Sequence, residues 1–204
     1  NYGLSIAEKL ITFRNIEKGF RLAGTQAENE AADWIVEEME KIGLQDVTKE
    51  SLCADSWDFR QASVTVLFPE KIKAMEACSF TFLEGTEPEG ITGEVVYVGD
   101  GTKGNYEGIE VKDKIVLMDT DAYYTYWYNS IFSQAEERGA KAVISTVMDR
   151  GPGTYTDDII SVQDVMGTVN IPAVMMTKSD GDRLRTMLKE DKHVTVNIKV
   201  DIKV

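Results

Sequence analysis

Three short apolar runs in the middle of the chain constrain the fold more than any other feature. Residues 95–98 and 115–118 are apolar and are bounded by Gly, Asp and Lys, a pattern typical of strands buried on both faces. Residues 130–138 have helix-forming composition and end at Gly139, where a left-handed residue can close a helix. The third run, 142–146, follows directly. The order strand, strand, helix, strand predicts an α/β fold.

Four sequence blocks carry a resemblance to a known family. They are Glu-Val-Val-Tyr-Val-Gly at 94–99, Val-Lys-Asp-Lys-Ile-Val-Leu at 111–117, Arg-Gly-Ala-Lys-Ala-Val-Ile at 138–144 and Asn-Ile-Pro-Ala-Val at 170–174. Their content and order resemble the protease-associated (PA) domain inserted in zinc aminopeptidases of the aminopeptidase Y and glutamate carboxypeptidase type. Asp113 stands where that family usually has Gly, and a turn tolerates it because Asp accepts left-handed geometry.

The resemblance implies an α/β PA domain, built as a mixed sheet or open β-barrel flanked by helices, preceded by a helical segment. We expect residues 81–204 to form the PA domain and its return strand, and residues 1–80 to be a partial helical and strand segment of a peptidase domain. Strict alternation at 194–204 predicts an amphipathic strand. Ser179 is expected to cap a helix at 180–190, and Arg185 with Lys189 suits the negative end of its dipole. Both helix and strand would complete the domain.

A second helix signal lies near the start of the chain. Thr25 and Glu28 have capping-box spacing, so a helix is expected over 26–42, ended by Gly43. Arg21-x-x-Gly24-Thr25 and the helix after it resemble the amino-terminal part of the same peptidases, where such helices pack on the peptidase sheet. Its apolar stripe is Ala27, Ala31, Ile35, Met39 and Ile42. Deprived of that sheet, the chain would self-associate through Ala31, Ile35 and Met39.

The charge of the chain limits its partners. The sequence has 35 Asp and Glu against 22 Lys and Arg, a formal net charge of -13. Nucleic acid and anionic membrane surfaces need a basic footprint, so we expect neither as a partner. The resemblance implies instead the remainder of a peptidase domain, the peptide substrate of the parent protein, and a homodimer as a further option. It also favours an extracellular or cell-surface location, with the cytoplasm as the alternative.

The sequence predicts no catalytic residue and no metal ligand in this chain. A two-zinc site needs two histidines with several carboxylates, and His193 is the one histidine present. The resemblance implies a His-x-Asp ligand pair, but Thr195 stands where its Asp would be. Neighbouring acids, Asp119 with Asp121 and Asp157 with Asp158, are interpreted as solvated loop acids rather than a glycosidase pair or calcium site. Zinc is therefore expected only in the full-length parent.

An aromatic cluster is the candidate binding surface. It comprises Tyr123, Tyr124, Tyr126, Trp127 and Tyr128. Tyr and Trp offer large contact area at little cost in side-chain entropy and are enriched at binding hot spots. The alternative is that some of these rings seat the following helix against the sheet, and both roles can hold for different rings. The cluster is proposed as a partner or substrate surface.

Taken together, the resemblance implies a non-catalytic part of a zinc exopeptidase that stops before the metal ligands and is inactive alone. Such a module covers the active site, aids substrate selection or mediates protein contacts. The alternative is a free-standing module that binds peptide, glycan or calcium through the aromatic cluster or the acidic loop 149–164. Cys53 and Cys78 have no metal-type spacing and are interpreted as two unpaired buried thiols, with a disulfide as the other option.

Overall fold

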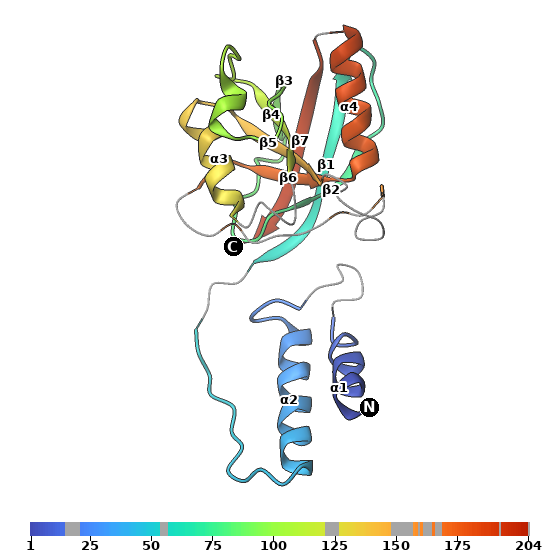
Figure 1. Ribbon diagram of the computed structural model, residues 1–204, viewed down its shortest axis with the longest axis vertical. Coiled ribbons are helices and arrows are strands. Elements are labelled where there is room, and N and C mark those ends of the chain that lie inside the picture. The colour runs from blue at the N-terminus through green and yellow to red at the C-terminus, as the bar shows by residue number, and fades with distance from the viewer. Residues whose placement is uncertain are drawn as a thin grey trace. The chain divides into compact units, whose positions relative to one another are not determined.

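The computed structural model of the chain describes residues 1–14, 21–53, 57–120, 127–147, 157–158, 160, 165, 169–191 and 193–203. The chain divides into two compact units, Asn1–Trp57 and Asp58–Val204 (Figure 1). The second unit begins at Asp58 rather than near residue 80, where the sequence analysis put the domain boundary. The strand β1 (Asp58–Phe68) explains the difference, because it pairs with other strands of the second unit.

The first unit contains the helices α1 (Tyr2–Leu10) and α2 (Gln26–Lys41). The Thr25 hydroxyl accepts from the backbone N–H of Glu28 at 3.3 Å, as the capping-box pattern predicts. The reciprocal half of the box is absent, because the Thr25 N–H donates to the Leu22 carbonyl at 3.2 Å instead. After α2, Gly43 has φ +92°, so its role as the helix terminator is confirmed.

The apolar stripe of α2 is only partly covered within its own unit. Ala27 and Ala31 are buried, whereas Ile35, Met39 and Ile42 are 36%, 40% and 61% exposed. Ala31 is therefore not available for the predicted self-association. The accessible part of the stripe is Ile35, Met39 and Ile42.

The second unit is a barrel of parallel and antiparallel strands, one of the two architectures expected, but it is closed rather than open. Around the barrel the strands follow the order β1-β2-β6-β5-β4-β3-β7, and β7 pairs back with β1. After β1 the strands are β2 (Met75–Ser79), β3 (Ile91–Tyr97), β4 (Ile115–Thr120), β5 (Ala142–Val147), β6 (Ala173–Met176) and β7 (Thr195–Lys203).

The last strand closes the barrel. β7 pairs antiparallel with β1 on one side, where Asp58 lies opposite Lys203, and with β3 on the other, where Ile91 lies opposite Ile198. Its alternating side chains Val194, Val196, Ile198 and Val200 are buried, so the predicted amphipathic strand is confirmed. The alternation fixes which face is buried, whereas the pairing partners depend on the whole barrel.

Strands β3, β4, β5 and β6 run parallel to one another, and two helices pack against them. α3 (Tyr128–Glu137) and α4 (Lys178–Asp191) lie on either side of these strands in Figure 1. The short 3₁₀ helix η1 (Lys103–Tyr106) follows β3. Asp113 has φ +61°, and its N–H donates to the Gly139 carbonyl at 2.8 Å. The left-handed turn expected at Asp113 is confirmed.

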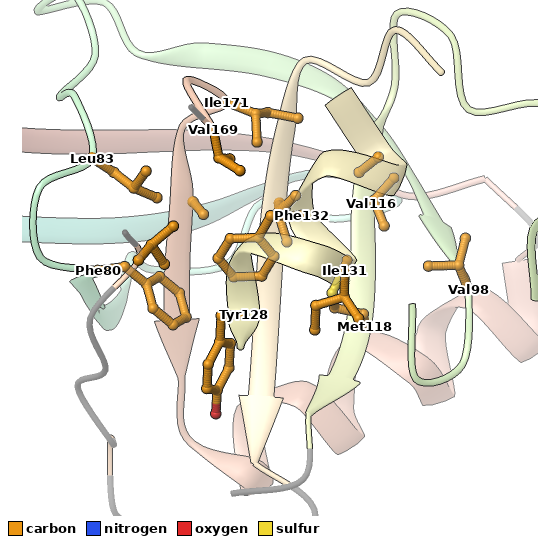
Figure 2. Packing of buried hydrophobic residues seen from close by; sticks show 14 of the residues in the cluster. Phe80, Leu83, Val98, Val116, Met118, Tyr128, Ile131, Phe132, Val169 and Ile171 are labelled. Carbon is orange, nitrogen blue, oxygen red and sulfur yellow. The ribbon is translucent and has the colours of Figure 1, made fainter. Parts of the chain in front are cut away.

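One apolar core cluster lies between α3 and the barrel (Figure 2). Phe132 is fully buried, with ring centroids 4.8 Å from Phe80 and 5.8 Å from Tyr128. Val116 and Met118 of β4 contribute to the same cluster.

The runs 115–118 and 142–146 are buried along their length, as predicted. In the run 95–98, Val95 and Val98 are buried but Tyr97 is 39% exposed, so the expectation that β3 is buried on both faces was wrong.

Both cysteines are free thiols, as the sequence analysis favoured. Cys78 is buried in β2, whereas Cys53 is exposed, which corrects the expectation that both are buried. Across the described residues, the helices are too short and too polar to cross a membrane.

Candidate functional site

A polar network lies where the parallel strands end. Tyr97 is the last residue of β3, Asp119 lies next to the end of β4, and Thr146 lies next to the end of β5. The Tyr97 hydroxyl donates to Asp119 Oδ2 at 2.6 Å, and the Thr146 hydroxyl donates to Asp119 Oδ1 at 2.7 Å. Because parallel strands bring their carboxyl ends to one edge, three strands converge on a single carboxylate.

Arg185 of α4 completes the network. Its Nη1 forms an ion pair with Asp119 Oδ1 and donates to Thr146 Oγ1 at 3.1 Å. Its Nη2 donates to Asp182 Oδ1, one turn earlier in α4, at 2.6 Å. Its guanidinium carbon lies 5.9 Å from the centre of the Tyr97 ring. The Arg185 and Asp119 side chains are only 16% and 11% exposed, so this is a largely buried charge pair.

The close seating of α4 depends on a glycine. A Cβ added at Gly181 would overlap the Thr146 side chain. Leu184 is fully buried, whereas Asp182 and Arg183 are exposed. The helix begins with a cap from Thr177, whose Oγ1 accepts from the Asp180 N–H at 3.1 Å, rather than from the predicted Ser179.

The network shifts the ionisation of two of its members. Burial, and then the hydrogen bond to Asp119, raises the pKa of Tyr97 to about 12. Tyr97 therefore stays protonated at neutral pH and keeps donating to the carboxylate. The hydrogen bond from Arg185 lowers the pKa of Asp182, which favours the charged form of its carboxylate.

Two further hydroxyl groups lie near the ends of β4 and β5, those of Thr120 and Ser145. The Thr120 and Ser145 hydroxyl oxygens are 2.8 Å apart, and Thr120 Oγ1 donates to the Thr146 carbonyl at 3.1 Å. His193 lies elsewhere, 3.6 Å from Glu94 and in ring contact with Phe68. With no imidazole beside these hydroxyls, the network suits recognition of a charged group rather than nucleophilic catalysis.

The structure separates the described members of the aromatic cluster. Trp127 is 67% exposed and immediately precedes α3. Tyr128 is buried at 2% exposure, with its ring centroid 5.2 Å from that of Phe80. Tyr128 therefore packs α3 against the barrel, which is the alternative role named for these rings, and it is not accessible at the surface. Tyr123, Tyr124 and Tyr126 lie outside the described residues.

The acidic pairs are likewise only partly described. Asp119 is used by Arg185 and is buried, which corrects its interpretation as a solvated acid. Asp157 lies 3.4 Å from Lys178, and Asp158 accepts from Ser179 at 3.2 Å. Asp121 and nearly all of the acidic loop 149–164 lie outside the described part of the chain, where Asp157, Asp158 and residue 160 are the exceptions. No cluster of three or more His, Cys, Asp or Glu suited to a metal occurs among the described residues.

Residues 91–184 match the family model of the PA domain. The chain therefore contains a PA domain, and the resemblance seen in the sequence is confirmed at that level. The match spans β3 to Leu184 in the first half of α4 and so includes Tyr97, Asp119 and Thr146, whereas Arg185 lies one residue beyond it.

Longer curated proteins resemble nearly the whole chain. Carboxypeptidase Q of Rattus norvegicus is 25% identical over 194 residues, covering 91% of this chain and 40% of that protein. Carboxypeptidase Q of Bos taurus is 24% identical with the same coverage. The chain thus spans about two fifths of the length of these relatives.

Solved structures show the same fold. A peptidase M28 precursor from Shewanella amazonensis SB2B has a TM-score of 0.72 and 23% identity, covering 98% of this chain and 47% of that one. An aminopeptidase from Aneurinibacillus sp. strain AM-1 has a TM-score of 0.63 and 22% identity over 98% of this chain and 45% of its own. BSAP, a zinc aminopeptidase from Bacillus subtilis, has a TM-score of 0.63 and 22% identity, covering 97% and 43%.

Sequence reasoning did not bring the network together. The sequence predicted a solvated loop acid at Asp119 and a favourable interaction of Arg185 with the helix dipole. It indicated no role for Tyr97 or Thr146. A signal was present, since Asp119 ends a run of buried residues, 115–118, and a charge at the end of a buried strand needs a partner. That partner was not identifiable from sequence because it lies 66 residues further along the chain.

Proposed function

We propose that this barrel is the inserted, non-catalytic module of a zinc exopeptidase and that it controls which peptides reach the active site. The observation that carries the proposal is the pairing of the strands by which the chain enters and leaves the barrel. Asp58 at the start of β1 lies directly opposite Lys203 at the end of β7. Adjacent entry and exit points let a domain be inserted without disturbing its host.

The comparisons support the proposed parent. The PA-domain match, the similarity to carboxypeptidase Q and the fold shared with a zinc aminopeptidase all concern peptidases. The finer assignment to the aminopeptidase Y and glutamate carboxypeptidase type is part of this proposal. The proposal also includes a zinc site in the parent, held by residues outside this chain. The chain alone is then expected to hydrolyse no peptide.

The first unit would serve as part of the peptidase domain. α2 exposes Ile35, Met39 and Ile42 along one stripe, and a two-helix unit this small buries too little apolar surface to be stable alone. We propose that the remainder of the peptidase domain covers this stripe. A homodimer is the alternative. Sedimentation of the full-length parent distinguishes the two, because a stripe covered by the peptidase domain leaves a monomer, whereas a dimer through the stripe is dissociated by Met39→Glu.

The parent would act outside the cell or at its surface, with the cytoplasm as the alternative, and fractionation of the native cells decides between them. Peptide substrates would meet the module at the side that carries the exposed Trp127.

A free-standing binding module remains the competing function. Reading the native gene beyond the codon for Val204 separates them, since the proposal requires a strand followed by a His-x-Asp ligand pair.

Excision of the barrel tests the function directly. In the full-length parent, residues 59–202 are replaced by a short Gly-Ser linker, which suffices because paired antiparallel residues are about 5 Å apart. We expect hydrolysis of a single-residue chromogenic substrate to survive, while kcat/KM for longer peptides changes. Equal kinetics for both substrate lengths, before and after excision, would refute control of substrate access.

A further inference from the structure

The seat of Arg185 has the features of a binding site built for a guanidinium group. Three groups from three strands meet there: the Asp119 carboxylate, the Thr146 hydroxyl and the Tyr97 ring. Asp119 is buried, with 8% of the whole residue exposed. Hydrogen bonds from Tyr97 and Thr146, neither of which belongs to α4, hold its carboxylate in place. The barrel therefore preorganises the site without help from the helix.

The chemistry of the seat selects arginine over lysine. Arg185 donates from Nη1 to Asp119 and Thr146 and from Nη2 to Asp182, while its guanidinium carbon lies over the Tyr97 ring. A planar guanidinium supplies these two nitrogens and the flat face together. A compact ammonium lacks both the fork of donors and the flat face. The hydroxyls of Thr120 and Ser145 bond to each other and to backbone, so they leave the carboxylate to its cationic partner.

The helix that supplies Arg185 is attached by few contacts. Among the residues of α4 whose burial the structure describes, Gly181 and Leu184 are buried and the others are exposed or half-buried. Arg183 and Thr186 of the same helix are exposed. Helices with few buried apolar contacts open at lower free energy than the rest of a fold.

We propose that Asp119, Thr146 and Tyr97 form a recognition site for an arginine side chain, which Arg185 fills from α4 as an internal ligand. α4 acts as a lid, and lifting it frees the site for an arginine of another peptide or protein segment. The effective concentration of the tethered Arg185 keeps the site closed in the resting chain. This site is independent of the proposed peptidase parent, because every group in it lies in the barrel unit.

Chemical rescue of Arg185→Ala tests the site. Thermal unfolding of the 204-residue chain is measured with millimolar methylguanidinium chloride, methylammonium chloride or sodium chloride at equal ionic strength. Methylguanidinium is expected to raise the Tm of Arg185→Ala by several degrees, because it occupies the vacated seat. The other two salts are expected to leave the Tm unchanged.

Two variants make the result specific. Arg183→Ala removes an exposed arginine from the same helix and should give no methylguanidinium-dependent rise, as should the wild type. Asp119→Asn combined with Arg185→Ala should abolish the rescue. If Arg185→Ala does not fold, recovery of its folded circular dichroism signal by methylguanidinium carries the same weight, and Arg185→Met keeps the packing of the side-chain stem for a second measurement.

Binding in trans completes the test. N-acetyl-arginine amide is expected to bind Arg185→Ala measurably tighter than it binds the wild type, in which Arg185 competes. An equal response of Arg185→Ala and Arg183→Ala to methylguanidinium, or an equal effect of methylammonium, would overturn the proposal.

Discussion

The two helices of the barrel unit are seated in opposite ways. α3 buries Tyr128, Ile131, Phe132 and Ala135 against β4 and β5, and its contacts are almost wholly apolar. α4 instead approaches through Gly181 and Leu184 and fastens itself with the buried Arg185–Asp119 pair. Apolar burial stabilises in proportion to area, whereas a buried ion pair fixes geometry at little net gain. The α3 side is therefore the stable side, and the α4 side is the one built to be released.

The largest effect is expected from Phe132→Ala on the α3 side. Phe132 is fully buried between Phe80 and Tyr128, and truncating such a side chain costs about 3–5 kcal/mol. Denaturant unfolding of the chain measures the loss. A loss below about 1 kcal/mol, the range of surface substitutions, would mean that α3 does not anchor this core.

Breaking the ion pair is expected to cost somewhat less. Arg185→Met leaves the Asp119 carboxylate buried without its cation, at a cost of about 3 kcal/mol, the low end for such pairs because neither side chain is fully buried. Adding Asp119→Asn removes the lone charge and should recover part of that loss. If the double variant is no more stable than Arg185→Met, the two side chains are not coupled.

The close approach of α4 to β5 is tested by Gly181→Ala. The added methyl group would overlap Thr146, and overpacking of this kind costs about 1–3 kcal/mol. Gly104→Ala is the matched control, since a Cβ at Gly104 meets nothing within 4 Å. Comparable losses in the two variants would show that helix seating is not responsible.

A smaller effect with a defined pH dependence is expected from Tyr97→Phe. Loss of the hydrogen bond to Asp119 costs about 1 kcal/mol. Because the folded pKa of Tyr97 is raised from 10.0 to about 12, its hydroxyl contributes stability that is complete below pH 10 and is lost as pH rises towards 12. The stability difference between wild type and Tyr97→Phe should therefore shrink over that window. A constant difference would contradict the assigned pKa shift.

The smallest effect is expected from Trp127→Ala. Its side chain is 67% exposed, and surface substitutions change stability by about 0.5 kcal/mol or less. A larger loss, measured by the same unfolding experiment, would show that Trp127 supports α3 rather than offering a contact surface.

The elements of the barrel also show how much of the fold could be predicted from the sequence. The apolar runs 115–118 and 142–146 predicted two of the parallel strands, because a doubly buried strand must be apolar along its length. The run 95–98 also predicted its strand, although Tyr97 leaves one face of β3 partly exposed. The closure of the barrel was not predictable, since alternation in β7 reveals its buried face and not its two partners.

The polar site was harder to predict than the core. Tyr97, Thr146 and Arg185 come from β3, β5 and α4, and no local pattern links residues so far apart. Asp119 could be flagged as a charge at the end of a buried strand, but its cation depends on how α4 lies on the barrel. The different roles within the aromatic cluster were unpredictable for a similar reason. Composition does not distinguish the exposed Trp127 from the buried Tyr128.

Native-state hydrogen exchange most directly tests whether the two sides of the barrel are stabilised separately. The amides of α3 and α4 are compared in the wild type and in Arg185→Met. We expect α4 to exchange faster than α3 in the wild type, and Arg185→Met to speed exchange in α4 while the α3 amides retain more protection. If both helices exchange at one common rate in both proteins, the unit opens as a whole, and the distinction between an anchored α3 and a releasable α4 is contradicted.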